Sequence, residues 1–282
     1  MSSIKELAGQ TIWYGASSIA ARFINYLLTP YLTYTLANTS DYGKMGLIYS
    51  LIPILNIIFT YGFETAYFRF ASKDDNKQTI YNTTALSLLF STIVFTALLW
   101  TNQSVVGKIT GLSEFPQIIQ LSIAIIALDA LSTIPFAKLR ADGRPKKFAF
   151  IKISGILLNI FFTWFFIGYC PAQLQKDPSS WISNIYNPAT NPIVYVVLAN
   201  VIQSAFTLLL LFSEIKQIRF KFNTKLWAQM MLYSLPLIVA GMGGMINETF
   251  DRLMLRWWLP GEVVFREQQV GIYNACYKLS IL

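Results

Sequence analysis

The segment "ALDALSTIPFAKLRADGRPKKFAFIKI" (Ala127–Ile153) decides the fold class of this chain. Both of its ends belong to long apolar runs, and basic side chains gather between them. A helix that spans a membrane needs roughly 20 mostly apolar residues, and cytoplasmic loops carry an excess of Lys and Arg. The segment therefore predicts two membrane-spanning helices joined by a short, basic, cytoplasmic loop.

The composition supports a membrane protein and excludes several other classes. Of the 282 residues, 54% are hydrophobic and 13% are charged, whereas a soluble domain carries about 25% charged residues. The net charge is +8, but the basic residues lie between apolar runs, so we expect no nucleic-acid partner. The chain has no histidine, and Cys170 and Cys276 are far apart. We therefore expect no metal site and no cofactor.

Apolar runs of spanning length recur along the whole chain. They are too long and too evenly apolar for the strands of a membrane β-barrel. An eighth run begins near Val270 and is not complete at Leu282. The seven before it are Thr11–Leu36, Met45–Phe63, Tyr81–Trp100, Ile118–Phe136, Phe148–Cys170, Pro192–Phe212 and Tyr233–Leu259.

Basic residues concentrate in every second link between the spans. The links after the second, fourth and sixth spans are rich in Lys and Arg, and the alternate links are poor in them. This bias predicts a cytoplasmic N-terminus. The segment Pro171–Pro192, with its Pro, Asn, Ser, Trp and Tyr residues, is then expected to be an irregular interfacial loop on the outer side.

An internal repeat suggests how the spans are grouped. The stretch "SDYGKMGLIYSL" (Ser40–Leu51) at the second span is echoed by "QQVGIYNACYKLS" (Gln268–Ser280) at the eighth. Repeats separated by an even number of spans share one orientation, which is the parallel type of transporter repeat. We therefore predict an all-α integral membrane transporter with a six-helix lobe over 1–222 and the start of a second lobe over 223–282.

Charged residues inside the spans are the main functional candidates, because each costs at least about 2.5–3.5 kcal/mol to insert. Arg22 lies mid-span with Asn25 on the same helical face, which suits either a bound phosphate or a structural ion pair. Asp129 is expected to pair with Arg22, to carry a proton, to hold a cation, or to form a structural hydrogen bond or ion pair with another helix. Glu64 and Arg69 lie near a span end, as do Arg140, Lys152 and Lys278, and most charged residues at such boundaries are snorkelling anchors.

A third group of charges lies in "INETFDRLML" (Ile246–Leu255). Glu248, Asp251 and Arg252 share one helical face, and the i,i+4 order of Glu248 and Arg252 favours a helical ion pair. Such a pair would lower the cost of insertion. We expect this face to line a water-filled passage.

Four segments resemble the polysaccharide-biosynthesis branch of the multidrug/oligosaccharidyl-lipid/polysaccharide exporter superfamily, the flippases for O-antigen (lipopolysaccharide) and capsule repeat units. They are "YGFETAYFRFAS" (Tyr61–Ser72), Ala127–Ile153, "INETFDRLML" and "VGIYNACYKLS" (Val270–Ser280). The resemblance implies two six-helix lobes in a bacterial inner membrane. It also implies alternating access, driven by an ion gradient, that carries an undecaprenyl-pyrophosphate-linked oligosaccharide outward.

The same resemblance implies residue roles and partners. The partners would be the lipid-linked oligosaccharide, membrane lipids and other polysaccharide-assembly proteins. Residues implied to bind the anionic head group are Arg22, Asn25, Arg69, Asn247, Arg252 and Lys278. Carboxylates implied to couple an ion or proton are Glu64, Asp129, Glu248 and Asp251.

Other functions stay open on the sequence. One is an exporter of drugs or small cations from the same superfamily. Another is a membrane glycan polymerase or glycosyltransferase, although no catalytic motif is present and we expect no enzyme. Because the resemblance implies a complete second lobe, we also expect the chain to be part of a longer transporter, to need a partner, or to be a non-transporting remnant.

Overall fold

The computed structural model shows the fold of a multi-span helical membrane protein, with no strand among the residues it describes. The predicted site residues Arg22 and Asn25 lie outside that part of the chain, as does the side chain of Lys278. The described residues are 15, 19–20, 23–24, 26–36, 38–73 and 76–280, with side chains as far as 277.

The described helices follow the predicted order of spans, and each of them except α9 begins earlier than its apolar run. Polar first turns and capping side chains extend them, as where the Asn38 side chain accepts a hydrogen bond from the Ser40 backbone N–H at 3.0 Å. The bounds are α2 Thr39–Thr60, α3 Phe63–Ala71, α4 Lys77–Thr101, α5 Gln103–Thr110, α6 Pro116–Ala141, α7 Pro145–Trp164, η1 Phe165–Tyr169, α8 Cys170–Lys176, η2 Trp181–Asn184, α9 Pro192–Leu210, α10 Phe212–Ile215, α11 Thr224–Trp258 and α12 Val263–Ser280.

Six described helices are long and apolar enough to cross a membrane: α2, α4, α6, the continuous Pro145–Lys176 segment, α9 and α11. The predicted eighth span corresponds to α12, which is not among these six. Polar residues such as Glu267 and Asn274 lower its hydropathy, and both are buried. Packing against α2 and α11, more than contact with lipid, therefore stabilises α12.

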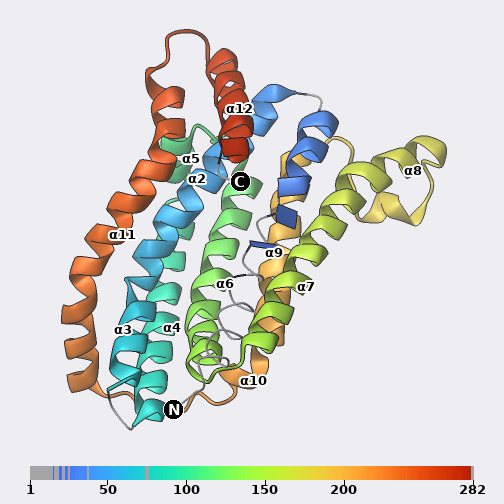
Figure 1. Ribbon diagram of the computed structural model, residues 1–282. Helices are drawn as coiled ribbons and strands as arrows, with labels where there is room; N and C mark the ends of the chain where they lie inside the picture. The colour runs from blue at the N-terminus through green and yellow to red at the C-terminus, as the bar shows by residue number, and fades with distance from the viewer. Residues whose placement is uncertain are drawn as a thin grey trace.

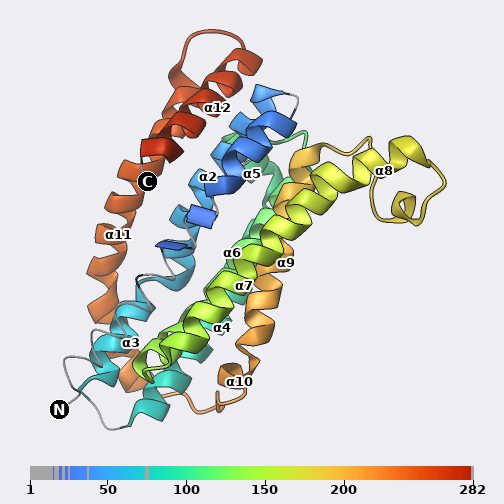
Figure 2. The ribbon, with the colours of Figure 1, turned by 45° about the vertical axis from the view of Figure 1, so that its right-hand side comes forward.

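The long helices run roughly side by side (Figure 1). In the middle of the bundle α6 packs against α4 and α9, and α7 packs against α9. On the other side α11 packs against α2 and α3, and α12 packs against α2 (Figure 2). One end of the bundle holds the basic turns around 141–145 and 211–224, and we call it the basic end. The opposite end holds α5, α8 and the first turns of α12.

Two predicted boundaries are corrected by the backbone. The second span ends at Thr60, because Tyr61 and Gly62 adopt left-handed conformations with φ of 36° and 72°. Helix α3 then begins in a new direction. The predicted irregular loop Pro171–Pro192 is partly helical, because a π-helical turn carries α7 directly into α8 as far as Lys176.

Helices α2 and α12 cross so closely that glycine is required on both. A Cβ atom at Gly43 would lie 1.9 Å from the Glu267 carbonyl oxygen, and one at Gly271 would lie 2.5 Å from the Thr39 carbonyl oxygen. Both neighbours are backbone atoms that no rotamer change can remove. This crossing holds α12, the last described helix, against α2.

A buried carboxylate holds the basic end together. Glu214, on the short helix α10, is fully buried and accepts hydrogen bonds from Lys147 and Arg144 at 2.7–2.8 Å. The Tyr81 hydroxyl donates to the Glu214 backbone carbonyl at 2.9 Å. Burial alone would raise the pKa of Glu214, but the hydrogen bonds from Lys147 and Ser213 and the two nearby cations lower it below its ordinary value.

We expect Gly43→Ala to destabilise the protein, because overpacking a close contact costs about 1–3 kcal/mol. Gly243→Ala is the matched control, since a Cβ there meets nothing within 4 Å. Thermal unfolding of both variants in detergent measures the difference. Equal melting temperatures would show that α2 and α12 do not cross as closely as described.

We expect Glu214 to make stability pH-dependent. Because its folded pKa is lowered, its contribution is fully present above the unfolded pKa, about 4.3, and is lost as pH falls through the lower folded value. Thermal unfolding between about pH 6 and pH 3 should therefore fall more steeply for the wild type than for Glu214→Gln. A control, Glu262→Gln, changes an exposed carboxylate and should leave the wild-type slope intact.

Candidate functional site

A polar stripe runs along the most apolar span. Helix α9 has a mean hydropathy of 2.1, yet Asn200, Gln203, Ser204 and Thr207 recur at i, i+3, i+4 and i+7. This spacing places all four on one face of the helix. The face is directed toward α6 and α7, which α9 contacts.

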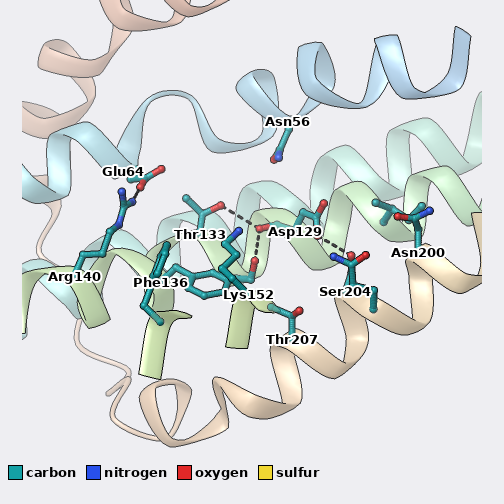
Figure 3. Close-up of a pocket in the computed structure, with 14 residues that line it drawn as sticks. Asn56, Glu64, Asp129, Thr133, Phe136, Arg140, Lys152, Asn200, Ser204 and Thr207 are labelled. Carbon is teal, nitrogen blue, oxygen red and sulfur yellow. Dashed lines mark hydrogen bonds and ion pairs between the residues drawn. The ribbon is translucent and has the colours of Figure 1, made fainter. Parts of the chain in front are cut away.

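The stripe forms one wall of a polar cavity of about 430 Å³. Its lining side chains come from α2, α3, α6, α7 and α9, and Figure 3 shows the labelled ones converging on one space. The polar ones include Asn56 from α2 and Glu64 from α3. The described lining consists of Asn56, Glu64, Ile125, Asp129, Ser132, Thr133, Phe136, Arg140, Phe148, Lys152, Asn200, Gln203, Ser204 and Thr207.

Asp129 lies halfway along α6 and faces this cavity. Its Oδ1 accepts a hydrogen bond from the Ser204 hydroxyl of α9 at 2.8 Å. Lys152 of α7 borders the same cavity, with its Nζ 4.6 Å from the centre of the Phe136 ring. Lys152 lies close enough to Asp129 for the two opposite charges to stabilise one another. The carboxylate thus links α6 to α9 by a hydrogen bond, and α7 places a cation near it.

An ion pair lines the cavity on the side toward the basic end. The Arg140 guanidinium contacts the Glu64 carboxylate, and each side chain is about one-third exposed, at 35% and 38%. Arg140 also lies over the rings of Phe68 and Phe148, at 4.9 and 5.8 Å. This ion pair fixes α3 against α6 at the mouth of the cavity.

A separate polar cluster joins α11 and α12. The predicted ion pair between Glu248 and Arg252 is not formed: the Arg252 Nη1 donates to the Glu248 backbone carbonyl at 2.6 Å and contacts the Asp251 carboxylate at 3.3 Å. Its Nε donates to Asn274 Oδ1 of α12 at 3.2 Å, and the guanidinium lies 4.4 Å from the centre of the Tyr277 ring. Arg252 is buried, so its side chain contacts Asn274 on the neighbouring helix α12 and not the carboxylate of Glu248, which is exposed on α11.

The remaining predicted residues are dispersed. Arg69 is exposed at the end of α3, 4.9 Å from the centre of the Tyr233 ring of α11. Asn247 and Glu248 are exposed on α11. The predicted set thus divides between the cavity, the Arg252 cluster and the surface of α11, and Lys278 is placed only by its backbone in α12.

A further buried carboxylate lies where α2 and α12 cross. Glu267 accepts a hydrogen bond from the Ser40 hydroxyl at 2.6 Å and lies 3.7 Å from Lys44 Nζ and 3.5 Å from Arg256 Nη2. Its side chain is 5% exposed. This Glu267 network joins α2, α11 and α12 at the end of the bundle opposite the basic end.

Sequence reasoning missed several of these residues, although two signals were available. From its place in the sequence, Lys152 is expected to be a boundary residue. Helix α7 begins at Pro145, however, and Lys152 lies seven residues further along it. That is two helical turns inside the span. The polar stripe of α9 lies in a segment of high hydropathy, which does not suggest a polar site. The i, i+3, i+4 and i+7 spacing of its polar residues is nevertheless visible in the sequence.

The comparison with protein families bears on this arrangement. A family model described as "Polysaccharide biosynthesis protein" matches residues 7–139 and 181–282. The chain belongs to this family. Members of the polysaccharide biosynthesis family are typically transporters or flippases. Curated proteins and solved structures gave no match. The unmatched stretch between the two parts includes Arg140 and Lys152, which supply the positive charges of the cavity.

We expect Asp129 and Lys152 to be energetically coupled. Lys152→Met leaves the Asp129 carboxylate without its nearby counter-charge, and interaction energies within one polar network are about 0.5–3 kcal/mol. The double variant Asp129→Asn/Lys152→Met should recover most of the lost stability, because no uncompensated charge is left. A double-mutant cycle of thermal stability measures the coupling. Additive effects of the two single changes would contradict it.

Proposed function

We propose that this protein is a flippase for an undecaprenyl-pyrophosphate-linked oligosaccharide in a bacterial inner membrane. The observation that carries the proposal is the polar, charged cavity enclosed by apolar spanning helices. Charged groups at membrane depth mark substrate or ion pathways, because their insertion is costly. The family of the chain supports cargo from polysaccharide biosynthesis.

The proposed orientation places the basic end in the cytoplasm. The turns there carry Arg144, Lys146 and Lys147 on one side and Lys216, Arg219 and Lys221 on the other, as the positive-inside bias requires. The cavity mouth at Glu64 and Arg140 then lies toward the leaflet on which the cargo is assembled. The Glu267 network lies toward the outer leaflet, where cargo would be released in alternating access.

The proposed residue roles follow from which charges are already compensated. Among the described residues, Asp129, Asp251 and Glu64 each have a cation nearby, whereas Glu248 has no ion pair. Glu248 is therefore our first candidate for coupling an ion or proton. For the pyrophosphate, the exposed guanidinium of Arg69 is the most accessible of the described basic candidates.

The direct test is flipping by the full chain in proteoliposomes. Radiolabelled undecaprenyl-pyrophosphate oligosaccharide is placed in one leaflet, and its appearance in the other is measured with a membrane-impermeant oxidant of sugars. We expect oxidation to require the protein and to respond to an imposed ion gradient. Transport of a hydrophobic cation in place of the lipid-linked sugar would instead identify a drug exporter.

We expect Arg69→Ala to slow flipping by about tenfold, the equivalent of one lost contact of about 1.4 kcal/mol. Arg69 is exposed and its visible contact is with one ring, so the melting temperature should change little. Arg219→Ala, at an exposed residue of the basic end, is the matched control and should flip normally. Unchanged flipping by Arg69→Ala would remove this residue from the head-group site.

A further inference from the structure

The charges of the cavity cancel in pairs. Asp129 lies near Lys152, and Glu64 is ion-paired with Arg140. All four side chains line the same cavity. Its described wall therefore presents local dipoles and no net formal charge.

This balance disfavours an ionic ligand. Hard cations bind to oxygen ligands that carry negative charge, and the ammonium of Lys152 would repel a cation at Asp129. Phosphate groups bind to Arg or Lys side chains that are free to form charge-assisted hydrogen bonds, and Arg140 is already held by Glu64. The charge pattern favours a neutral, polar ligand.

Several polar side chains of the cavity wall can form further hydrogen bonds. The Asn56 Oδ1 is buried and has no partner among the described residues, and Figure 3 shows this amide directed from α2 into the cavity. The side chains of Gln203 and Thr207 likewise make no hydrogen bond within the described part of the chain. Amides and hydroxyls both donate and accept, which matches a ligand whose own hydroxyls do the same.

The remaining wall and the volume point to the same class of ligand. Ile125, Phe136 and Phe148 supply apolar surface beside the polar groups, and a pyranose ring has C–H surface as well as hydroxyls. The volume of about 430 Å³ falls within the range of roughly 300–1,000 Å³ typical of small-molecule sites. It suits a sugar ring but not an oligosaccharide together with pyrophosphate and a lipid tail.

We propose that this cavity binds a sugar ring of the cargo. The polar stripe of α9 and the Asn56 amide bind its hydroxyls. The pyrophosphate binds elsewhere, at basic residues outside the cavity. This inference rests on the proposed function, and it assigns Asp129 and Lys152 to a neutral binding site in place of an ion-coupling site.

The test is saturation-transfer NMR on the full chain in lipid nanodiscs, with N-acetylglucosamine, galactose and rhamnose as separate probes. We expect a saturable signal from at least one of these sugars. Gln203→Leu and the near-isosteric Thr207→Val should each weaken its binding by about tenfold, the equivalent of about 1.4 kcal/mol. Gln175→Leu, on exposed α8, is the matched control and should bind as the wild type does.

The result that overturns the inference is a wild-type protein with no saturable sugar signal, or a signal that survives both Gln203→Leu and Thr207→Val. Melting temperatures show whether either variant is misfolded, and Thr207→Val decides the question if Gln203→Leu is. Saturable binding of sodium or pyrophosphate at the cavity, abolished by Gln203→Leu, also overturns it.

The flipping assay separates this inference from the proposed function. A wild type that flips the lipid-linked oligosaccharide but binds no sugar in the cavity leaves the proposed function intact and removes the inference. A wild type that binds a sugar through Gln203 but flips nothing upholds the site and removes the flippase.

Discussion

A charge inside an apolar bundle is stable only where another group of the protein compensates it, and in this chain that constraint acts first at Asp129. The Ser204 hydroxyl of α9 and the Lys152 ammonium of α7 both lie by this carboxylate of α6. Rotating α6 or α9 would break the hydrogen bond between Ser204 and Asp129. This polar contact therefore restricts the relative rotation of the two helices, whereas apolar side chains facing lipid tails permit many rotations.

The same principle recurs at the two ends of the bundle. At the basic end, Glu214 holds α10 to the start of α7 through Lys147 and Arg144. At the opposite end, Glu267 holds α12 to α2 and α11. In each case an acid on one helix is compensated by cations on others, so the carboxylates define which helices are neighbours.

The two ends nevertheless differ in what a transport cycle would require of them. At the crossing of α2 and α12, Gly43 and Gly271 bring the two backbones into contact. Opening a path there requires separating these backbones and breaking the contacts of Glu267. On the side of the cavity toward the basic end, the corresponding contact is the ion pair of Glu64 and Arg140, which is partly exposed. Breaking it requires movement of two side chains and no separation of backbones.

The local pattern of the sequence determined the helical fold, the order of the spans and the presence of polar groups at membrane depth. Apolar runs of spanning length have few alternatives to the helix in lipid, because every backbone group must be hydrogen-bonded. For the same reason Asp129 and Arg252 were recognisable as unusual without any structure. The left-handed turn at Tyr61 and Gly62 was less readable, because an apolar run continues across it.

Only the tertiary structure decided which polar groups meet. Spacing along one helix favoured Glu248 as the partner of Arg252, but packing against α12 supplied Asn274 and left Glu248 exposed. Lys152 looked like an end anchor until α6 placed Asp129 beside it. Sequence periodicity reports the faces of one helix, whereas partners are chosen by the relative rotation and depth of different helices. Those depend on the packing of the whole bundle.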